Sequence, residues 1–551
     1  MTACVAVTNH QSTSPGVLLV AGVVLAALTE AIASTVLSLG RADVIGDTYA
    51  TPDELAWLDT GYTALKLIGF VATPWLMTRM NSRDIVLAAV LSMALACGAA
   101  VITARLDLLI ALRVIQGFAG GVLLVAGQAV TFLVYPRAWQ PALQALFATG
   151  SVVASATIAP ALQGWLLDSR SWPWIFFSIM PVALLSAGLL LSAGSPPVLT
   201  TARRRFDWVG MILIFATLCC FVYVLSQGSR WDWFEESRIL WLAALGTATL
   251  LAFLAWQTIV KPQGLLDFSV FRSGDFAFAF VVSFVAGAAL FGSAYLIPSF
   301  AVSVLALTPT AAGLLLLPSG VLFTVALFFA AFLMNKIHCP PIATVPFGIL
   351  MTMGAMWMLS GATIESGADD MMSAILLRGL GLGFLFLSIT LIAFGNLSAQ
   401  NLGSAIGLFN AGRQIGGLMG VAGLQTLIEH NVAVNYAVLS ANVTSGTPAV
   451  AERLAAMSAM LVERGMDAAA ASRASIGLLA RAVAGQSTVI AFDTAFNAVA
   501  LLFVVAAPVL VGVKIGLGRY ARRRAVAAVD RAIRLGPREL GRVGPAPHRF
   551  P

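Results

Sequence analysis

The chain has 551 residues, of which 59% are hydrophobic and only 10% are charged, and its formal net charge is +7. Soluble domains carry about 25% charged residues, so this composition excludes an ordinary soluble enzyme and indicates a polytopic membrane protein. The five cysteines and four histidines show neither a disulfide framework nor zinc-ligand spacing, and we expect no metal site.

Apolar segments of about 20 residues, each long enough to cross a bilayer, follow one another along the chain. We count fourteen of them, near residues 17–41, 55–77, 84–104, 107–133, 141–166, 173–193, 208–227, 239–259, 275–299, 311–334, 341–361, 371–395, 402–428 and 489–516. Residues 1–16 contain no Lys or Arg, so we expect a first transmembrane helix rather than a cleaved signal peptide. An even number of spans places both termini on one side of the membrane.

Positive and negative side chains occupy opposite sets of loops. Arg79, Arg137, Lys336 and the arginines after residue 516 fall on one side, whereas Asp47, Glu236 and most other loop acids fall on the other. Because cytoplasmic loops are enriched in Lys and Arg, both termini are predicted to be cytoplasmic. We interpret the net positive charge as this topology signal and expect no nucleic-acid binding.

A weak internal repeat relates the two halves of the chain. Residues 75–80 (Trp-Leu-Met-Thr-Arg-Met) are echoed by residues 332–337 (Phe-Leu-Met-Asn-Lys-Ile), and Arg113 and Arg378 lie at similar depths in their spans. Two homologous six-helix bundles explain both matches, with a substrate site at their interface near the bilayer midplane. The expected parts are a cytoplasmic N-terminus (1–16), a first bundle (17–193), a linker with two inserted helices (194–274), a second bundle (275–516) and a basic cytoplasmic tail (517–551).

Glu30 lies within the first apolar span, where a carboxylate costs about 2.5–3.5 kcal/mol on insertion scales. Such a group has to face the protein interior or an aqueous cavity, and we expect it to exchange a proton. The basic side chains available to it are Lys66, Arg113, Arg378 and Arg413. A purely structural ion pair with one of these bases is the alternative.

Two further helical stripes carry polar side chains. Arg113, Gln116 and Gly117 share one face of the fourth span, which indicates either conformational coupling or a packing seam with a structural arginine. Asp59 and Lys66 share a stripe with Tyr62 on the second span, so both are candidates for proton coupling. For Asp59, near the outer edge of the span, a solvated rim position is the alternative.

Several motifs resemble one transporter family. Residues 113–117 (Arg-Val-Ile-Gln-Gly) look like the helix 4 signature of the major facilitator superfamily, and residues 158–164 (Ile-Ala-Pro-Ala-Leu-Gln-Gly) are similar to its antiporter motif. Residues 172–177 and 413–417 fit the fourteen-helix drug:proton antiporters of the EmrB/QacA type, closest to the EmrB branch. The resemblance implies an all-α membrane fold, in which two six-helix bundles and two inserted helices make fourteen transmembrane helices. It also assigns conformational roles to Arg79, Gln116, Gly117, Pro160, Gly164, Arg378 and Arg413.

The chain departs from the family pattern at three places. The loop after the second span retains Arg79 but lacks the Asp that the family has there, and Ala159 replaces the usual Gly of the antiporter motif. In the first span the acid is shifted by one residue, about 100° around the helix, so the equivalence of Glu30 to the family's acid is a hypothesis.

The resemblance implies a proton-coupled efflux transporter that exports lipophilic drugs or toxic compounds across the bacterial inner membrane by alternating access. The proton-motive force would be its energy source, with no cofactor. A dedicated exporter of a metabolite or siderophore is the alternative, and an importer comes third. The isolated histidines disfavour a membrane enzyme, and the absence of a filter-like segment disfavours a channel.

Aromatic and polar side chains in the spans are candidates for the substrate cavity, although such residues also face lipid or pack between helices. The candidates are Phe118, Gln144, Phe147, Tyr295, Phe300 and Asn410, together with Phe70, Phe409 and Met419.

A long segment with two amphipathic stretches, 449–464 and 469–484, lies between residues 429 and 488. It resembles the large penultimate loop of the EmrB branch, which implies a periplasmic membrane fusion protein and an outer-membrane channel as partners. A self-contained lid over the cavity mouth is the alternative.

Overall fold

The computed structural model describes residues 16–194, 206–259, 266–444 and 446–539, and all regular secondary structure among them is helical. Twelve helices in these ranges are long and apolar enough to cross a membrane. The helices α3 (Pro52–Leu76) and α16 (Ala399–Asn442) bring the total to the expected fourteen. The predicted N-terminus (1–15), parts of the predicted linker (195–205 and 260–265) and the end of the basic tail (540–551) lie outside the described residues.

The first half of the chain forms α1 (Val17–Ser34), α2 (Leu37–Thr48), α3, α4 (Ser82–Val101), α5 (Leu106–Leu133), α6 (Gln140–Ala148), a π-helical segment η1 (Thr149–Ile158), α7 (Ala159–Ser169) and α8 (Pro173–Ser192). The inserted pair is α9 (Trp208–Gln227) and α10 (Ser237–Ile259), joined by the short turns η2 (Ser229–Trp231) and η3 (Trp233–Glu235). The second half forms α11 (Gly274–Ser303), α12 (Pro309–Leu314), α13 (Leu317–Lys336), α14 (Val345–Leu359), α15 (Ala368–Phe394), α16, α17 (Pro448–Glu463) and α18 (Ala468–Glu539).

Three of the expected spans are interrupted. The first helix ends at Ser34 instead of residue 41, where the hydroxyls of Ser34 and Thr35 donate to the carbonyl of Ala31 and compete with the helical hydrogen bonds. The fifth span contains η1, a Gly/Ser/Thr-rich stretch with π-helical geometry. The tenth span breaks between α12 and α13, because Pro318 has no N–H to donate to the preceding turn.

Two other spans are longer than expected. The helix α16 runs on to Asn442 instead of ending near residue 428, and the second amphipathic stretch is the beginning of α18 instead of a separate helix. Hydropathy could not locate these ends, because α16 has no Gly or Pro between residues 424 and 442, and α18 continues as a helix through Gly485. The segment between α16 and α18 therefore holds one separate helix, α17, which matches the first predicted stretch.

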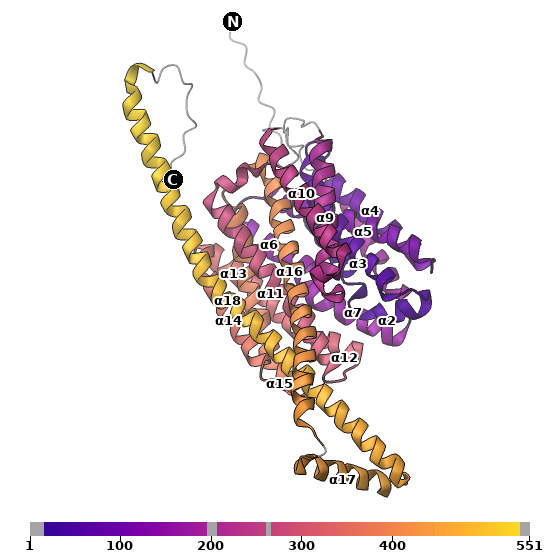
Figure 1. Ribbon diagram of the computed structural model, residues 1–551. Coiled ribbons are helices and arrows are strands. Elements are labelled where there is room, and N and C mark those ends of the chain that lie inside the picture. The colour runs from indigo at the N-terminus through magenta and orange to yellow at the C-terminus, as the bar shows by residue number, and fades with distance from the viewer. Residues whose placement is uncertain (1–15, 195–205, 260–265, 445, 540–551) are drawn as a thin grey trace.

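The two halves of the chain lie side by side in Figure 1. In the first half α3 and α4 pack against α5, and α1 packs against α8; in the second half α11 packs against α16, and α13 and α14 against α15. The halves meet where α3 and α5 contact α16 and where α7 contacts α12. The inserted helix α9 packs on α3 and also reaches α16, so it lies along the seam between the halves.

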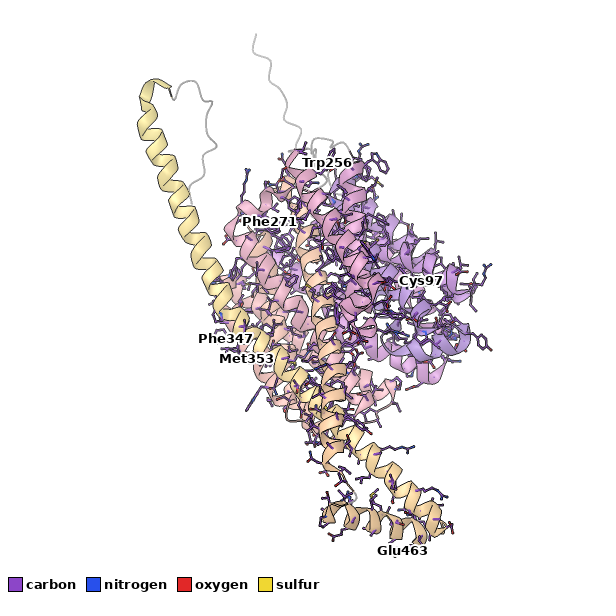
Figure 2. All side chains as sticks on the ribbon, in the orientation of Figure 1. Cys97, Trp256, Phe271, Phe347, Met353 and Glu463 are labelled. Atoms are coloured by element: carbon purple, nitrogen blue, oxygen red, sulfur yellow. The ribbon has the colours of Figure 1, made fainter. Side chains whose placement is uncertain are left out.

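The helices α16, α17 and α18 project beyond the remaining helices as a hairpin (Figure 1). Glu463, the last residue of α17, lies far from the helix bundle in Figure 2. Among the helices, α17 packs against α18. This projecting hairpin consequently offers a surface that the transmembrane packing does not use.

Candidate functional site

A buried ion pair joins α1 to α3. Lys66 Nζ lies 2.5 Å from Glu30 Oε1, and both side chains are more than nine-tenths buried. The Tyr62 hydroxyl donates a 3.1 Å hydrogen bond to the same carboxylate oxygen. Because Tyr62 and Lys66 are one helical turn apart on α3, they approach Glu30 from one stripe, as the spacing predicted.

Arg113 lies beside this pair and connects it to the edge of the bundle. Its Nη1 donates to the Ala33 carbonyl at 2.8 Å and to Gln116 Oε1 at 3.0 Å, and its guanidinium carbon lies 4.1 Å from the centre of the Tyr62 ring. Its Nη2 lies 3.8 Å from Asp59 Oδ1. The cluster therefore runs from the half-buried Asp59 through Arg113 and Tyr62 to Glu30.

Asp59 has a second basic partner at the edge of the bundle. Arg41, on α2, donates a 3.0 Å hydrogen bond to Asp59 Oδ2. Asp59 thus has two basic neighbours and is still 36% exposed, so the solvated rim position remains an alternative to a role in proton coupling.

The glycines of α5 allow the backbones of α3 and α5 to touch. A Cβ atom on Gly117 would lie 2.1 Å from the Tyr62 carbonyl oxygen, and one on Gly121 would lie 2.1 Å from that of Lys66. Only glycine fits at such an approach. This contact brings Arg113 within reach of the side chains of α3.

A second polar cluster crosses between the two halves of the chain. Asn410 Nδ2, on α16, donates to Gln128 Oε1, on α5, at 2.9 Å, and Gln128 Nε2 donates to Gln144 Oε1 at 3.3 Å. Arg413 donates to Asn410 Oδ1, and Gln144 donates to Thr131. The structure thus brings together the predicted residues Gln144, Asn410 and Arg413.

Gln128 was missing from the predicted site. Its signal was an amide in an otherwise apolar span, three residues before the polar Thr131. Such a buried amide needs hydrogen-bond partners, and it finds them on two other helices.

Arg378 lies in the core of the second half. Its Nε donates to Ser293 Oγ at 2.7 Å and its Nη2 to the Leu290 carbonyl at 3.5 Å, while Nη1 has no partner among the described residues. It therefore shares no contact with Glu30, although the sequence offered it as a neighbour.

Pro160 and Gly164 lie where the halves meet at α7 and α12. A Cβ on Gly164 would lie 2.5 Å from the Pro309 carbonyl oxygen, and one on Gly313 would lie 2.7 Å from that of Pro160. Asp168 accepts hydrogen bonds from both the backbone N–H and the hydroxyl of Thr310. Reciprocal small residues thus hold the two halves in backbone contact at this point.

The other predicted residues lie apart from these clusters. Arg79 is exposed after α3, with its guanidinium 5.1 Å from the Trp75 ring centre, and Phe118 is 36% exposed on α5. Phe147 is buried next to Gly127, and Tyr295 is half-buried on α11. Phe300 packs with Phe492 and Phe496 of α18, an aromatic contact that the separate spans did not suggest.

No group of three or more metal-ligating side chains occurs in the described part of the chain.

A family model described as "Major Facilitator Superfamily" matches residues 19–421. The chain belongs to the major facilitator superfamily. It is therefore a multi-pass membrane transporter of the all-α type, and its described residues include twelve helices that are long and apolar enough to span a membrane, to which α3 and α16 add two.

Within the superfamily, the chain is similar to proteins of the EmrB branch. It is 25% identical over 483 residues to the multidrug export protein EmrB of Escherichia coli (strain K12), which covers 87% of this chain and 92% of the relative. It is 23% identical to the fatty acid resistance protein FarB of Neisseria gonorrhoeae, covering 88% of this chain and 94% of that protein.

Solved structures share the superfamily fold. The human organic anion transporter MFSD10 superposes with a TM-score of 0.52 at 13% identity, covering 88% of this chain and 99% of the other. The proton:xylose symporter XylE gives the same TM-score and identity, covering 76% of this chain and 89% of the other. At this identity the two structures support the fold alone.

Proposed function

We propose that this protein exports lipophilic drugs or other toxic compounds across the bacterial inner membrane, in exchange for protons that enter through Glu30. The observation that carries the proposal is the buried contact of Glu30 with Lys66 and Tyr62. The EmrB-type relatives, whose names describe multidrug export and fatty acid resistance, support an export function.

The pair has the properties that a proton carrier needs. Protonation of Glu30 removes its negative charge and leaves the Lys66 ammonium without its partner, which is unfavourable in a buried site. The ion pair therefore has to rearrange when a proton binds, and Arg113 and Tyr62 are close enough to respond. Proton binding thereby changes the contacts between α1, α3 and α5.

Alternating access requires the two halves to separate at one end at a time. The α7–α12 contact at Gly164 and Gly313 is one such closure. The other lies between α3 and α16, where a Cβ on Gly407 would lie 2.4 Å from the Phe70 carbonyl oxygen. We propose that these two contacts open in turn, with both termini cytoplasmic and the proton-motive force as the energy source.

The projecting hairpin favours the proposal that the transporter binds a partner protein outside the inner membrane. Its helices carry exposed apolar side chains, among them Val438 on α16, Met460 on α17 and Ile476 on α18. We propose that a periplasmic membrane fusion protein, linked to an outer-membrane channel, binds here. A substrate dedicated to one metabolite or siderophore is the alternative to a broad drug range.

The test is proton movement in energised inside-out vesicles, with wild type and Glu30→Gln compared. Added substrate is expected to release protons from the wild-type vesicle lumen, and this release is expected to disappear in Glu30→Gln. Gly188→Ala serves as a matched control, because a Cβ at Gly188 meets nothing within 4 Å. Unchanged proton release in Glu30→Gln would reduce Glu30 to a structural role.

A further inference from the structure

The turn that joins the two inserted helices contacts both halves of the chain. We call residues 228–236, between α9 and α10, the strap. The strap lies at the end of the bundle from which the projecting hairpin extends, because it contacts α16 at Thr426 and Glu429, shortly before the hairpin. A segment in this place crosses the seam between the halves.

The strap and the helix before it are attached to the first half. Arg230 Nε lies 3.1 Å from Asp53 Oδ1, at the start of α3, but both side chains are more than 40% exposed and such a pair adds little. The Tyr223 ring of α9 lies 5.0 Å from the Trp57 ring of α3, centre to centre. Because α9 also packs more extensively on α3 than on α16, helix packing provides most of this attachment.

Two side chains of the strap reach α16 in the second half. The Trp233 indole N–H donates a 3.0 Å hydrogen bond to Thr426 Oγ1. The Ser229 hydroxyl donates to the carboxylate of Glu429, which also accepts from Gln425 at 3.0 Å. The side-chain contact of the strap with α16 thus consists of two hydrogen bonds.

The backbone of the strap is strained around Trp233. Asp232 and Trp233 have φ values of 48° and 55°, in the left-handed region that residues other than glycine adopt at an energetic cost. The Trp233 N–H donates to the Gly228 carbonyl at 2.7 Å, and a Cβ on Gly228 would lie 2.5 Å from the Trp233 ring. Strained backbone persists where surrounding contacts hold it, and it is common in switch regions. These contacts hold the Trp233 indole against α16.

We propose that the strap is a releasable tie between the two halves, which stays on α3 and releases α16 when this end of the transporter opens. The proposal rests on the alternating access of the proposed function. The strap biases the transporter towards the conformation in which this end is closed, and it gives the inserted helices a role in the transport cycle.

The two attachments differ in what their loss would cost. Separating α9 from α3 would break packing along both helices, including the contact of the buried Tyr223. Separating the strap from α16 breaks two hydrogen bonds, whose groups are exposed or partly exposed, so that water can replace the lost partners. The contact with α16 is therefore the one that opens and closes reversibly.

The test measures the separation of the halves at this end by double electron–electron resonance in lipid nanodiscs. Spin labels are attached to Ala104→Cys, in the turn after α4, and Ala368→Cys, at the start of α15, which are exposed positions on the two halves. The five native cysteines are replaced by alanine in this background.

Two variants remove the hydrogen bonds to α16 with little other change. Trp233→Phe removes the indole N–H and keeps an aromatic ring, and Ser229→Ala removes the hydroxyl. A hydrogen bond of this kind changes an equilibrium constant by about two- to tenfold. We expect each single variant to raise the ratio of the long to the short distance by about this factor, and the double variant to raise it further.

Controls separate this proposal from misfolding and from the export function. Trp231→Phe is the matched control, because Trp231 packs on the same apolar cluster but makes no hydrogen bond to α16 within the described residues. An unchanged distance distribution in folded Ser229→Ala/Trp233→Phe, a shift to the short distance, or an equal shift in Trp231→Phe would overturn the strap. Since the measurement needs no substrate, the expected shift in a protein that transports nothing would contradict the export function and leave the strap standing.

Discussion

Asn410 Nδ2 donates a 2.9 Å hydrogen bond to Gln128 Oε1, and this bond joins α16 to α5 across the boundary between the two halves of the transporter. Both side chains are more than nine-tenths buried. Gln128 continues the connection to Gln144, and Asn410 continues it to Arg413. Under the alternating access proposed above, in which the halves move relative to each other, this bond forms in one conformation and breaks in another.

Removing one partner of the Asn410–Gln128 hydrogen bond should destabilise the protein more than removing both partners. Gln128→Met removes the acceptor of one Asn410 N–H, while Asn410 still donates to the Ile406 carbonyl and accepts from Arg413. A buried donor left without an acceptor costs about 1–3 kcal/mol. We expect each single variant, Gln128→Met and Asn410→Leu, to be less stable than wild type, and the double variant to be more stable than the sum predicts. Thermal unfolding of the purified proteins measures this. Asn396→Leu, at an exposed position, is the control, and strict additivity would show that the bond does not couple the two residues.

The backbone contact at Gly164 should be intolerant of a single methyl group. A Cβ there would lie 2.5 Å from the Pro309 carbonyl oxygen, so Gly164→Ala has to push α7 and α12 apart. We expect the variant to fold but to transport at least about tenfold more slowly, because this end of the transporter cannot close. Vesicle uptake and size-exclusion chromatography report the two properties. Wild-type uptake by Gly164→Ala would exclude the contact as a closure, and Gly188→Ala again serves as the control.

The sequence determined the membrane spans more reliably than the contacts between them. The bilayer imposes the same requirement of apolar length on every span, and twelve helices of the described residues meet it. The break after Ser34 was not predictable in this way, since it depends on hydroxyl groups that bond to nearby carbonyls. Likewise, the sequence offered Glu30 several basic partners and could not choose Lys66, because that choice depends on how α1 and α3 pack.

A double substitution can separate the structural from the coupling role of the Glu30–Lys66 pair. Breaking a buried pair by removing one partner costs about 3–5 kcal/mol, whereas replacing both with apolar groups is often neutral. We therefore expect Glu30→Leu to lower stability and Glu30→Leu/Lys66→Met to recover it. Thermal unfolding provides the comparison.

The double variant should recover stability but should still lack proton coupling, because it has no carboxylate at position 30. Proton release from energised vesicles measures the coupling. If the double variant regained both stability and coupling, the proton would have to travel through another acid, and Asp59 would be the first residue to replace.

Residues 443–467 of the projecting hairpin should be dispensable for transport itself but not for the drug resistance of intact cells. Replacing residues 443–467 with a flexible linker removes α17, which packs against α18 outside the spanning helices. We expect the unfolding free energy of the bundle to change by less than about 0.5 kcal/mol, as for other surface changes. Transport in isolated vesicles should persist, because no fusion protein acts there. Drug resistance of intact cells should fall to the level of cells that lack the fusion protein. Loss of vesicle transport in this variant would instead identify the hairpin as a lid on the transporter, since the defect would then appear without any partner.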